Sequence, residues 1–280
     1  RWLKAFRLNV ALSARTLTGF VEEMGCVEGK PENVKLTDQS PLNFALVPSL
    51  VKNQSCVYVL KERLSLKSLF LGQDAFKVKD ASGEDVIKLK QSSLFDFGQD
   101  KMELKDIKND STLAVYRRAR IGFRETFYIY TVAKPYPEAQ PSNEDLDGQR
   151  LYCWGFLSTA RGCTCIEDYE VSQYYFDPAE PDQKDHPYKP LYIFKCWKPC
   201  FDMQTTIGFL ADENGGVKKE SEDDPGVMIA TVERGFLEWE AANCYGLQVA
   251  AGVDAGLCIA VMSIIDEIRE DQKANQQAYD

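Results

Sequence analysis

The sequence predicts a mainly β (α+β) protein: a closed antiparallel barrel of about twelve strands around a central hydrophobic C-terminal helix, preceded by an N-terminal helical extension. Three observations lead to this prediction. The 280-residue chain is 44% hydrophobic and 27% charged, a composition that buries a substantial core. Apolar and polar residues alternate from residue 56 to about residue 133. The longest apolar run, residues 246–265, lies near the C-terminus.

Residues 1–55 are expected to form the extension, part of it an amphipathic helix. Residues 1–21 hold four Lys or Arg residues and no acidic residue, which resembles the remnant of an organelle transit sequence. Leu3, Phe6 and Val10 also recur at helical spacing. This pattern favours either a helix lying on a partner or membrane, or a surface helix packed on the body of the protein.

The alternating region is expected to form antiparallel strands joined by tight turns. In the first hairpin, apolar positions alternate with lysines on both sides of the turn at residues 80–83: Phe76, Lys77, Val78 and Lys79, then Ile87, Lys88, Leu89 and Lys90. The same form returns 26 residues later, in residues 102–118. Residues 121–123 and 127–132 extend this meander with aromatic and β-branched residues.

Three polar loops interrupt the second half of the chain, at residues 134–148, 177–190 and 210–226. Each is longer than a hairpin turn, so each is either disordered or a contact element. Further strands are expected beside these loops, at residues 151–157, 169–176, 191–197, 203–210 and 227–232. So many strands need closure or stacking to protect their edges.

The C-terminal apolar run has three interpretations: a membrane span, a buried helix or the plug of a barrel. Asp254 stands in its middle, where an ionised carboxylate would cost about 2.5–3.5 kcal/mol in a bilayer. Asp254 is instead typical of a helix N-cap. We therefore expect a last strand at residues 245–251, a bend at Gly252, and a buried helix from Ala255 to about Arg269.

These residues resemble a known family. The segment from Gly246 through Gly252, Val253 and Asp254 to residue 267 resembles the end of LURP-one-related and tubby-like domains, in which a strand, a Gly-Val-Asp turn and a hydrophobic helix close the fold. The hairpin segments at residues 76–83 and 104–106 are also similar to that family. The resemblance covers about residues 56–272 and implies a twelve-stranded barrel around a central helix, shared with phospholipid scramblases. Residues 273–280 would form a polar tail.

Charge limits the partners. The net charge of -10 and the pI near 4.9 argue against general binding to DNA, RNA or anionic membranes, because those partners select basic surfaces. Residues 1–133 carry a formal charge of +5 and residues 134–280 a charge of -15. Either acidic loops cluster late in the chain, or the surface is dipolar and docks one way round on a partner.

Two groups of candidate binding residues follow. Tubby-like domains bind phosphoinositide head groups through basic side chains, so the resemblance implies an anionic-lipid site, for which the candidates are Arg117, Arg118, Arg120 and Arg124. The other interpretation of this cluster is a solvated strand end. The candidates for contact with a partner protein are aromatic: Trp2, Phe6, Tyr128, Tyr130, Tyr174 and Tyr175.

No catalytic residue, metal or cofactor is predicted. His186 is the only histidine and lies in a proline-rich loop, and no glycine-rich phosphate loop is present. Four cysteines could superficially bind zinc, but without the usual two-residue spacing: Cys163, Cys165, Cys196 and Cys200. The nine cysteines, an odd number, favour buried thiols in a reducing intracellular compartment, cytoplasmic or organellar.

The sequence therefore predicts a non-catalytic binding or scaffold protein, a subunit or linker whose partners are other protein subunits. Two alternatives stay open. One is a peripheral phospholipid-binding module at a membrane surface, which would recognise phosphoinositides. The other is an enzyme whose site cannot be recognised from the sequence.

Overall fold

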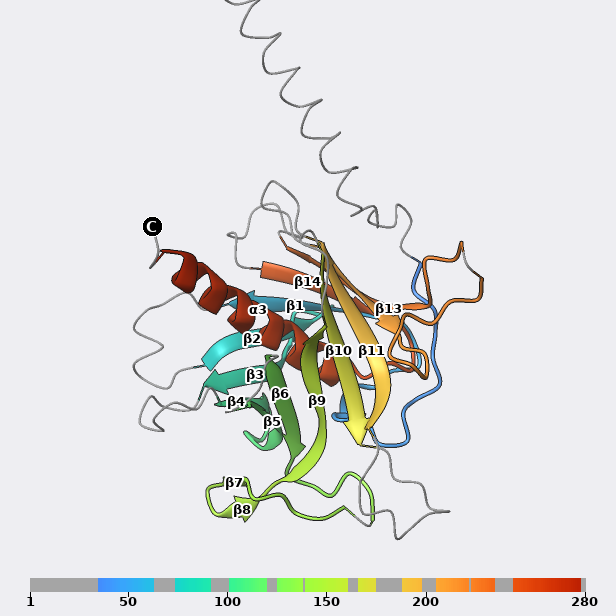
Figure 1. Cartoon of the computed structure of the whole chain (residues 1–280). Helices are drawn as coiled ribbons and strands as arrows, with labels where there is room; N and C mark the ends of the chain where they lie inside the picture. Colours follow the sequence, from blue (N-terminus) through green and yellow to red (C-terminus); the bar gives the residue numbers. More distant parts are fainter. Residues whose placement is uncertain are drawn as a thin grey trace, which may run out of the picture.

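The computed structural model confirms the predicted fold class: a closed antiparallel barrel of twelve strands with a helix through its centre (Figure 1). The structure describes residues 35–62, 74–91, 101–119, 125–137, 139–160, 166–174, 188–197, 205–221, 223–234 and 244–277. The helix expected near the N-terminus and the strand expected at residues 121–123 lie outside these residues.

The first half of the barrel is a meander. Its strands are β1 (Cys56–Glu62), β2 (Asp74–Asp80), β3 (Asp85–Gln91), β4 (Lys101–Asp106), β5 (Thr112–Arg118) and β6 (Thr126–Thr131). The two predicted hairpins are β2–β3 and β4–β5, with Val78 opposite Ile87 and Leu104 opposite Ala114. In the first turn, the Asp80 carboxylate accepts a hydrogen bond from the N–H of Ser82, and Gly83 has φ +84°.

The second half completes the barrel. Its strands are β9 (Tyr152–Ala160), β10 (Ile166–Tyr174), β11 (Tyr188–Trp197), β12 (Thr205–Leu210), β13 (Met228–Arg234) and β14 (Cys244–Val249). β9 pairs with β6, and β14 pairs with β1, which closes the ring. The short strands β7 (Asp145–Leu146) and β8 (Gln149–Arg150) form a separate hairpin outside the barrel.

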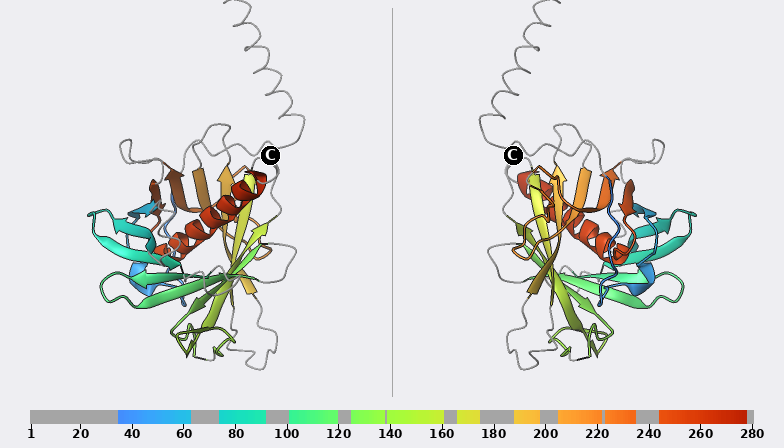
Figure 2. Two further views of the ribbon diagram at one scale, coloured as in Figure 1. Left: turned by 90° about the vertical axis from the view of Figure 1, so that its left-hand side faces the viewer. Right: turned by 90° about the vertical axis from the view of Figure 1, so that its right-hand side faces the viewer.

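Helix α3 (Ala255–Gln277) runs through the barrel, as the two side views show (Figure 2). Leu257, Ile259, Ile264 and Ile265 have no exposed surface, because inward side chains of the strands surround them. The helix passes the predicted end near Arg269 and enters the predicted polar tail. Apolarity ends where the helix leaves the core, but residues such as Gln272, Lys273 and Ala274 still favour helix.

Asp254 caps this helix as predicted: its carboxylate accepts a hydrogen bond from the N–H of Leu257 at 3.2 Å. Gly252, at the bend, has φ +77°. Among the described residues, no helix combines the length and apolarity that a bilayer crossing requires.

Residues 35–55 close one end of the barrel, although they were assigned to the N-terminal extension. Leu46, Val47 and Leu50 belong to the main core, and the N–H of Gln39 donates to the carbonyl of Ala251 at 2.8 Å. The prediction places the start of the barrel domain at residue 56, where alternation of apolar and polar residues begins. Residues 35–55 lack this alternation, because they form irregular chain and the 3-10 turn η1 (Pro48–Leu50) instead of a strand.

Candidate functional site

Alternation along β6 places aromatic side chains on both faces of the sheet. Phe127 and Ile129 point into the barrel and have no exposed surface. Tyr128 and Tyr130 consequently lie on the outside, because successive side chains of a strand point to opposite faces. Tyr130 packs there against Val115 and Leu151. The inner rings build the core, so the outer two are available to form a surface.

Cross-strand pairing extends this surface over four strands. Tyr128 lies directly opposite Phe156 of β9, with ring centroids 6.4 Å apart, and Tyr130 is 6.4 Å from Tyr128. Tyr174 of β10 lies opposite Tyr188 of β11, with centroids 4.2 Å apart. Tyr188 also meets the ring of Phe156 edge-on at 4.5 Å. These five residues form one connected surface, which we call the aromatic face.

A bulge in the pairing of β10 with β11 lies next to the contact between Phe156 and Tyr188. Ser172 of β10 lies opposite both Phe156 and Pro190, and is almost fully buried. The pairing register shifts between Val171 and Ser172. Such a bulge tolerates a proline that cannot donate a ladder hydrogen bond. The bulge therefore allows β11 to begin at Tyr188, which lies within the predicted loop 177–190.

Three phenols of the aromatic face, those of Tyr130, Tyr174 and Tyr188, are neutral at physiological pH. Burial is the main cause that raises the pKa of Tyr130, Tyr174 and Tyr188 above the usual phenol value. The Tyr188 hydroxyl donates a hydrogen bond to that of Tyr174. Burial also raises the pKa of the neighbouring Cys153 thiol to about 12, so this thiol is not an activated nucleophile. The face offers apolar contact and neutral hydrogen-bonding groups.

The structure brings together three of the predicted partner-binding residues: Tyr128, Tyr130 and Tyr174. Trp2, Phe6 and Tyr175 lie outside the described residues. Sequence reasoning missed Phe156 and Tyr188. Phe156 alternates with the buried Leu157, a signal that could have identified it as an outward residue. Tyr188 lies between Pro187 and Pro190, and these prolines conceal the start of its strand.

The predicted arginine cluster is divided between two sides of the barrel wall. Arg117 lies on the outside but is largely buried, and it forms an ion pair with Glu144 there. Arg118 lies opposite the inward-facing Phe127 and places its guanidinium 5.2 Å from the centre of that ring. Arg120 and Arg124 lie outside the described residues. Arg117 and Arg118 therefore do not converge on one head group, because neighbouring strand residues face opposite ways.

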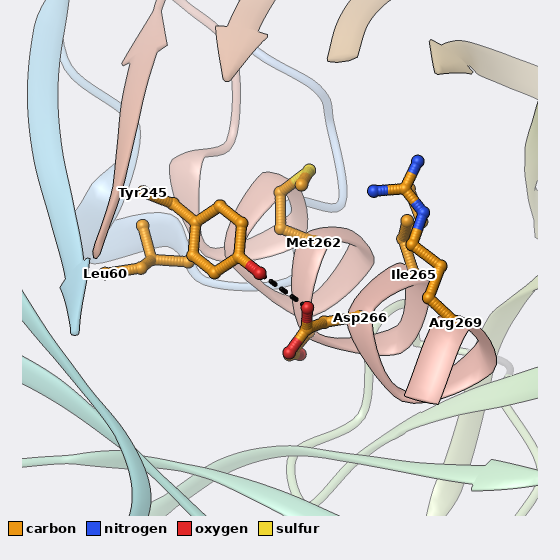
Figure 3. Close-up of a pocket in the computed structure, with 7 residues that line it drawn as sticks. Leu60, Tyr245, Met262, Ile265, Asp266 and Arg269 are labelled. Atoms are coloured by element: carbon orange, nitrogen blue, oxygen red, sulfur yellow. Dashed lines mark hydrogen bonds between the residues drawn. The ribbon is translucent and has the colours of Figure 1, made fainter. Parts of the chain in front are cut away.

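A second candidate lies where α3 leaves the core. Tyr245 donates a hydrogen bond to Asp266 at 2.6 Å beside a cavity of about 10 Å³ that is also lined by Leu60, Met262 and Arg269 (Figure 3). A space of this size holds at most one water molecule. These contacts hold the helix in the barrel and leave no room for a ligand.

Of the candidate metal ligands, the structure describes only some. No cluster of three or more His, Cys, Asp or Glu side chains in the described part of the chain could hold a metal ion. Of the four cysteines that could superficially bind zinc, only Cys196 is among the described residues. Its thiol is buried, 2.8 Å from the Thr206 hydroxyl and in contact with the Arg269 guanidinium.

No family model matches this chain, and no curated protein matches it. A crystal structure of a protein from Arabidopsis thaliana resembles it, with 13% sequence identity and a TM-score of 0.45. The similarity covers 81% of this chain and 99% of that chain. At this level it supports no statement about function, which must be argued from the residues of the chain itself.

Proposed function

We propose that this chain is a non-catalytic binding protein, a subunit or linker of a larger protein assembly that contacts a partner protein through the aromatic face. The observation that carries the proposal is the unbroken series of ring contacts from Tyr130 through Tyr128, Phe156 and Tyr188 to Tyr174. Tyrosine is enriched at protein interfaces because it combines apolar area with a hydrogen-bonding hydroxyl.

The scaffold favours such a contact energetically. The rings pack on one another and stand on strands of a closed barrel, so few rotatable bonds would have to be ordered on binding. Tyr188, which is 39% exposed, would be the main contact point for the partner. The half-buried rings around it would exclude water from that contact. The neutral phenols and the protonated Cys153 thiol support a binding role over a catalytic one.

We also propose that the barrel is of the LURP-one-related and tubby-like type. The resemblance rests on the residues from Gly246 to residue 267, which form the last strand, the Gly252 bend, the Asp254 cap and the buried helix. The lipid alternative is weakened, because Glu144 pairs with Arg117 and Arg118 faces Phe127. The predicted intracellular, cytoplasmic or organellar location stays a prediction.

A photo-crosslinking amino acid at position 188 tests the proposal in the native cell type. We expect a stoichiometric protein adduct that is lost when Phe156→Ala and Tyr174→Ala are added. The same crosslinker at Arg150, an exposed residue of β8, is the matched control. A face that forms no specific adduct, or one equal to that of the control, would contradict the proposal. Crosslinking mainly to phospholipid would favour the lipid alternative.

A further inference from the structure

Three serines of the chain are each followed by acidic residues at the second and the third position. The three segments are residues 82–85, 142–145 and 221–224, which begin with Ser82, Ser142 and Ser221. Acidic residues on this side of a serine attract a protein kinase whose substrate groove is basic, because kinases select substrates partly by charge pattern. The sequence pattern alone does not distinguish the three serines, but their surroundings in the structure differ.

Ser82 is held in the tight turn between β2 and β3. Its hydroxyl donates a hydrogen bond to the Asp80 carboxylate at 2.6 Å, and its N–H donates to the same oxygen at 2.9 Å. The hydroxyl bond is the main cause that lowers the pKa of Asp80 below its usual range. A phosphate on Ser82 would break this charge-assisted bond and stand beside the carboxylate. The turn therefore disfavours modification of Ser82.

Ser142 is tied to the start of β9. Its N–H and its hydroxyl both donate to the carbonyl of Leu151, at 2.7 Å and 2.8 Å. Leu151 is buried against Val115 and Tyr130. The Ser142 hydroxyl oxygen also accepts a hydrogen bond from the N–H of Glu144 at 3.1 Å. The hydroxyl is thus engaged as both donor and acceptor in a partly buried position.

Ser221 differs from both, because its side chain is exposed and its hydroxyl has no hydrogen-bond partner among the described residues. It lies in the loop between β12 and β13, which stands out from the wall of the barrel (Figure 1). Glu220 and Asp223, on either side of it, are exposed too. An enzyme can therefore reach the Ser221 hydroxyl and the charges beside it.

The backbone at this tip is bonded to the loop itself. The N–H of Asp224 donates to the carbonyl of Ser221 at 3.2 Å. The Asp224 carboxylate accepts hydrogen bonds from the N–H groups of Glu220 at 2.9 Å and Gly226 at 3.0 Å. None of these three bonds belongs to the ladder between strands. A kinase can consequently extend the tip in its groove without opening the barrel.

We propose that Ser221 is a phosphorylation site for a serine kinase with a basic substrate groove. The hydroxyl oxygen of Ser221 attacks the γ-phosphorus of ATP, and the bond from that phosphorus to the bridging oxygen of ADP breaks. The hydroxyl proton passes to the catalytic carboxylate of the kinase. The products are phosphoserine and ADP. This site is independent of the aromatic face and of the function proposed for it.

Phosphorylation would change the charge of the loop. Residues 218–224 hold two Lys and four Asp or Glu, a formal charge of -2. A phosphate adds about -1.5 to -2 at pH 7, so the negative charge of this segment about doubles. Ser221 lies in the part of the chain, residues 134–280, that already carries a charge of -15. The modification therefore strengthens contact with a basic partner and weakens contact with an acidic one.

The test incubates the folded full chain with Mg²⁺, ATP and a serine kinase that prefers acidic substrates, and locates the phosphate by peptide mapping with mass spectrometry. Ser221 should be modified about tenfold or more faster than Ser82 or Ser142, because their hydroxyls must first give up a hydrogen bond. Ser221→Ala should remove this phosphate and leave the melting temperature unchanged, since the side chain is exposed. The matched control is Ser82→Ala, which should leave modification of Ser221 unchanged.

Two further measurements complete the test. Short peptides with the sequences of the three segments lack the hydrogen bonds of the fold, so their rates should be more alike than those of the folded chain. A preference for Ser221 that is equally strong in the peptides would contradict selection by the structure. Protein isolated from its own cells with phosphatase inhibitors should contain phosphorylated Ser221. Its absence there, or modification of the folded chain at Ser82 or Ser142 ahead of Ser221, would overturn the proposal.

Discussion

The carboxylate of Asp254 accepts a hydrogen bond from the backbone N–H of Val47 at 2.9 Å, across 207 residues of sequence. The same carboxylate caps α3 through the N–H of Leu257. Asp254 therefore joins the segment that closes the barrel to the helix that fills it. Two elements that the sequence assigned to different domains depend on one buried side chain.

Replacing Asp254 by Asn should destabilise the fold. One oxygen of the carboxylate faces the Val47 N–H and the other faces the Leu257 N–H, so an amide would place an NH₂ group against one of these donors. A buried group left unsatisfied costs about 1–3 kcal/mol. Urea unfolding followed by circular dichroism measures the loss. Unchanged stability of Asp254→Asn would show that these two hydrogen bonds contribute little.

The stability difference between wild type and Asp254→Asn should also depend on pH. Burial raises the pKa of Asp254 above its usual range, although the backbone N–H bonds oppose this shift. The native state therefore holds the proton more tightly than the unfolded state. The stabilising contribution of protonated Asp254 to the free energy of unfolding is fully present below the pKa that Asp254 has in the unfolded state. It is lost as the pH rises through the pKa that Asp254 has in the native state. The Asn variant lacks this dependence, so the wild-type advantage should shrink as the pH rises from acid towards neutral.

Gly252→Ala should be among the most damaging single substitutions. Gly252 has φ +77°, and an added Cβ would lie 1.7 Å from the carbonyl oxygen of Gln39. The left-handed conformation costs about 1–2 kcal/mol, and the overlap adds about 1–3 kcal/mol. Gly83→Ala is the matched control, with φ +84° but nothing within 4 Å of the added Cβ. Thermal melting should rank Gly252→Ala well below Gly83→Ala, and equal effects would show that segment 35–55 packs less closely.

The barrel could be predicted because its signals are local. Alternation in the strands, the turn at residues 80–83 and the Asp254 cap each act within a few residues of chain. Segment 35–55 could not be assigned in this way, since its role depends on tertiary contacts such as Val47 with Asp254. The predicted end of α3, near Arg269, is too early. An apolar pattern indicates which residues are buried, whereas a helix can continue beyond its buried residues.

The candidate site was predictable only in part. The abundance of aromatics on β6 and β10 identified Tyr128, Tyr130 and Tyr174, but Phe156 and Tyr188 join them through cross-strand register. Arg117 and Arg118 lie on opposite sides of the barrel wall because successive residues of a strand point to opposite faces. This alternation could have been applied to the sequence.

Cysteine alkylation should follow a defined order in the native protein. Burial raises the pKa of the Cys153 thiol to about 12, so only about 10⁻⁴ of it is thiolate at pH 8. Burial also raises the pKa of Cys196 and Cys258, which are fully enclosed. Cys56 is partly exposed and should react with iodoacetamide before these three cysteines. Peptide mapping by mass spectrometry gives the order, with urea-unfolded protein as the control. Equal rates for Cys258 and Cys56 would contradict the buried position of α3.

Arg269 should hold α3 against strands β10 and β11 at the point where the helix leaves the core. Its guanidinium contacts the Cys196 thiol of β11 and lies 3.9 Å from the Glu167 carboxylate of β10, which also accepts a hydrogen bond from Tyr169 at 2.9 Å. Arg269→Leu should lower the free energy of unfolding by about 2 kcal/mol or more, because the largely buried Glu167 carboxylate would lose its ion pair with Arg269. Adding Glu167→Gln should restore part of the loss, which a double-mutant cycle of unfolding free energies measures. Strict additivity of the two changes would show that the ion pair does not anchor the helix.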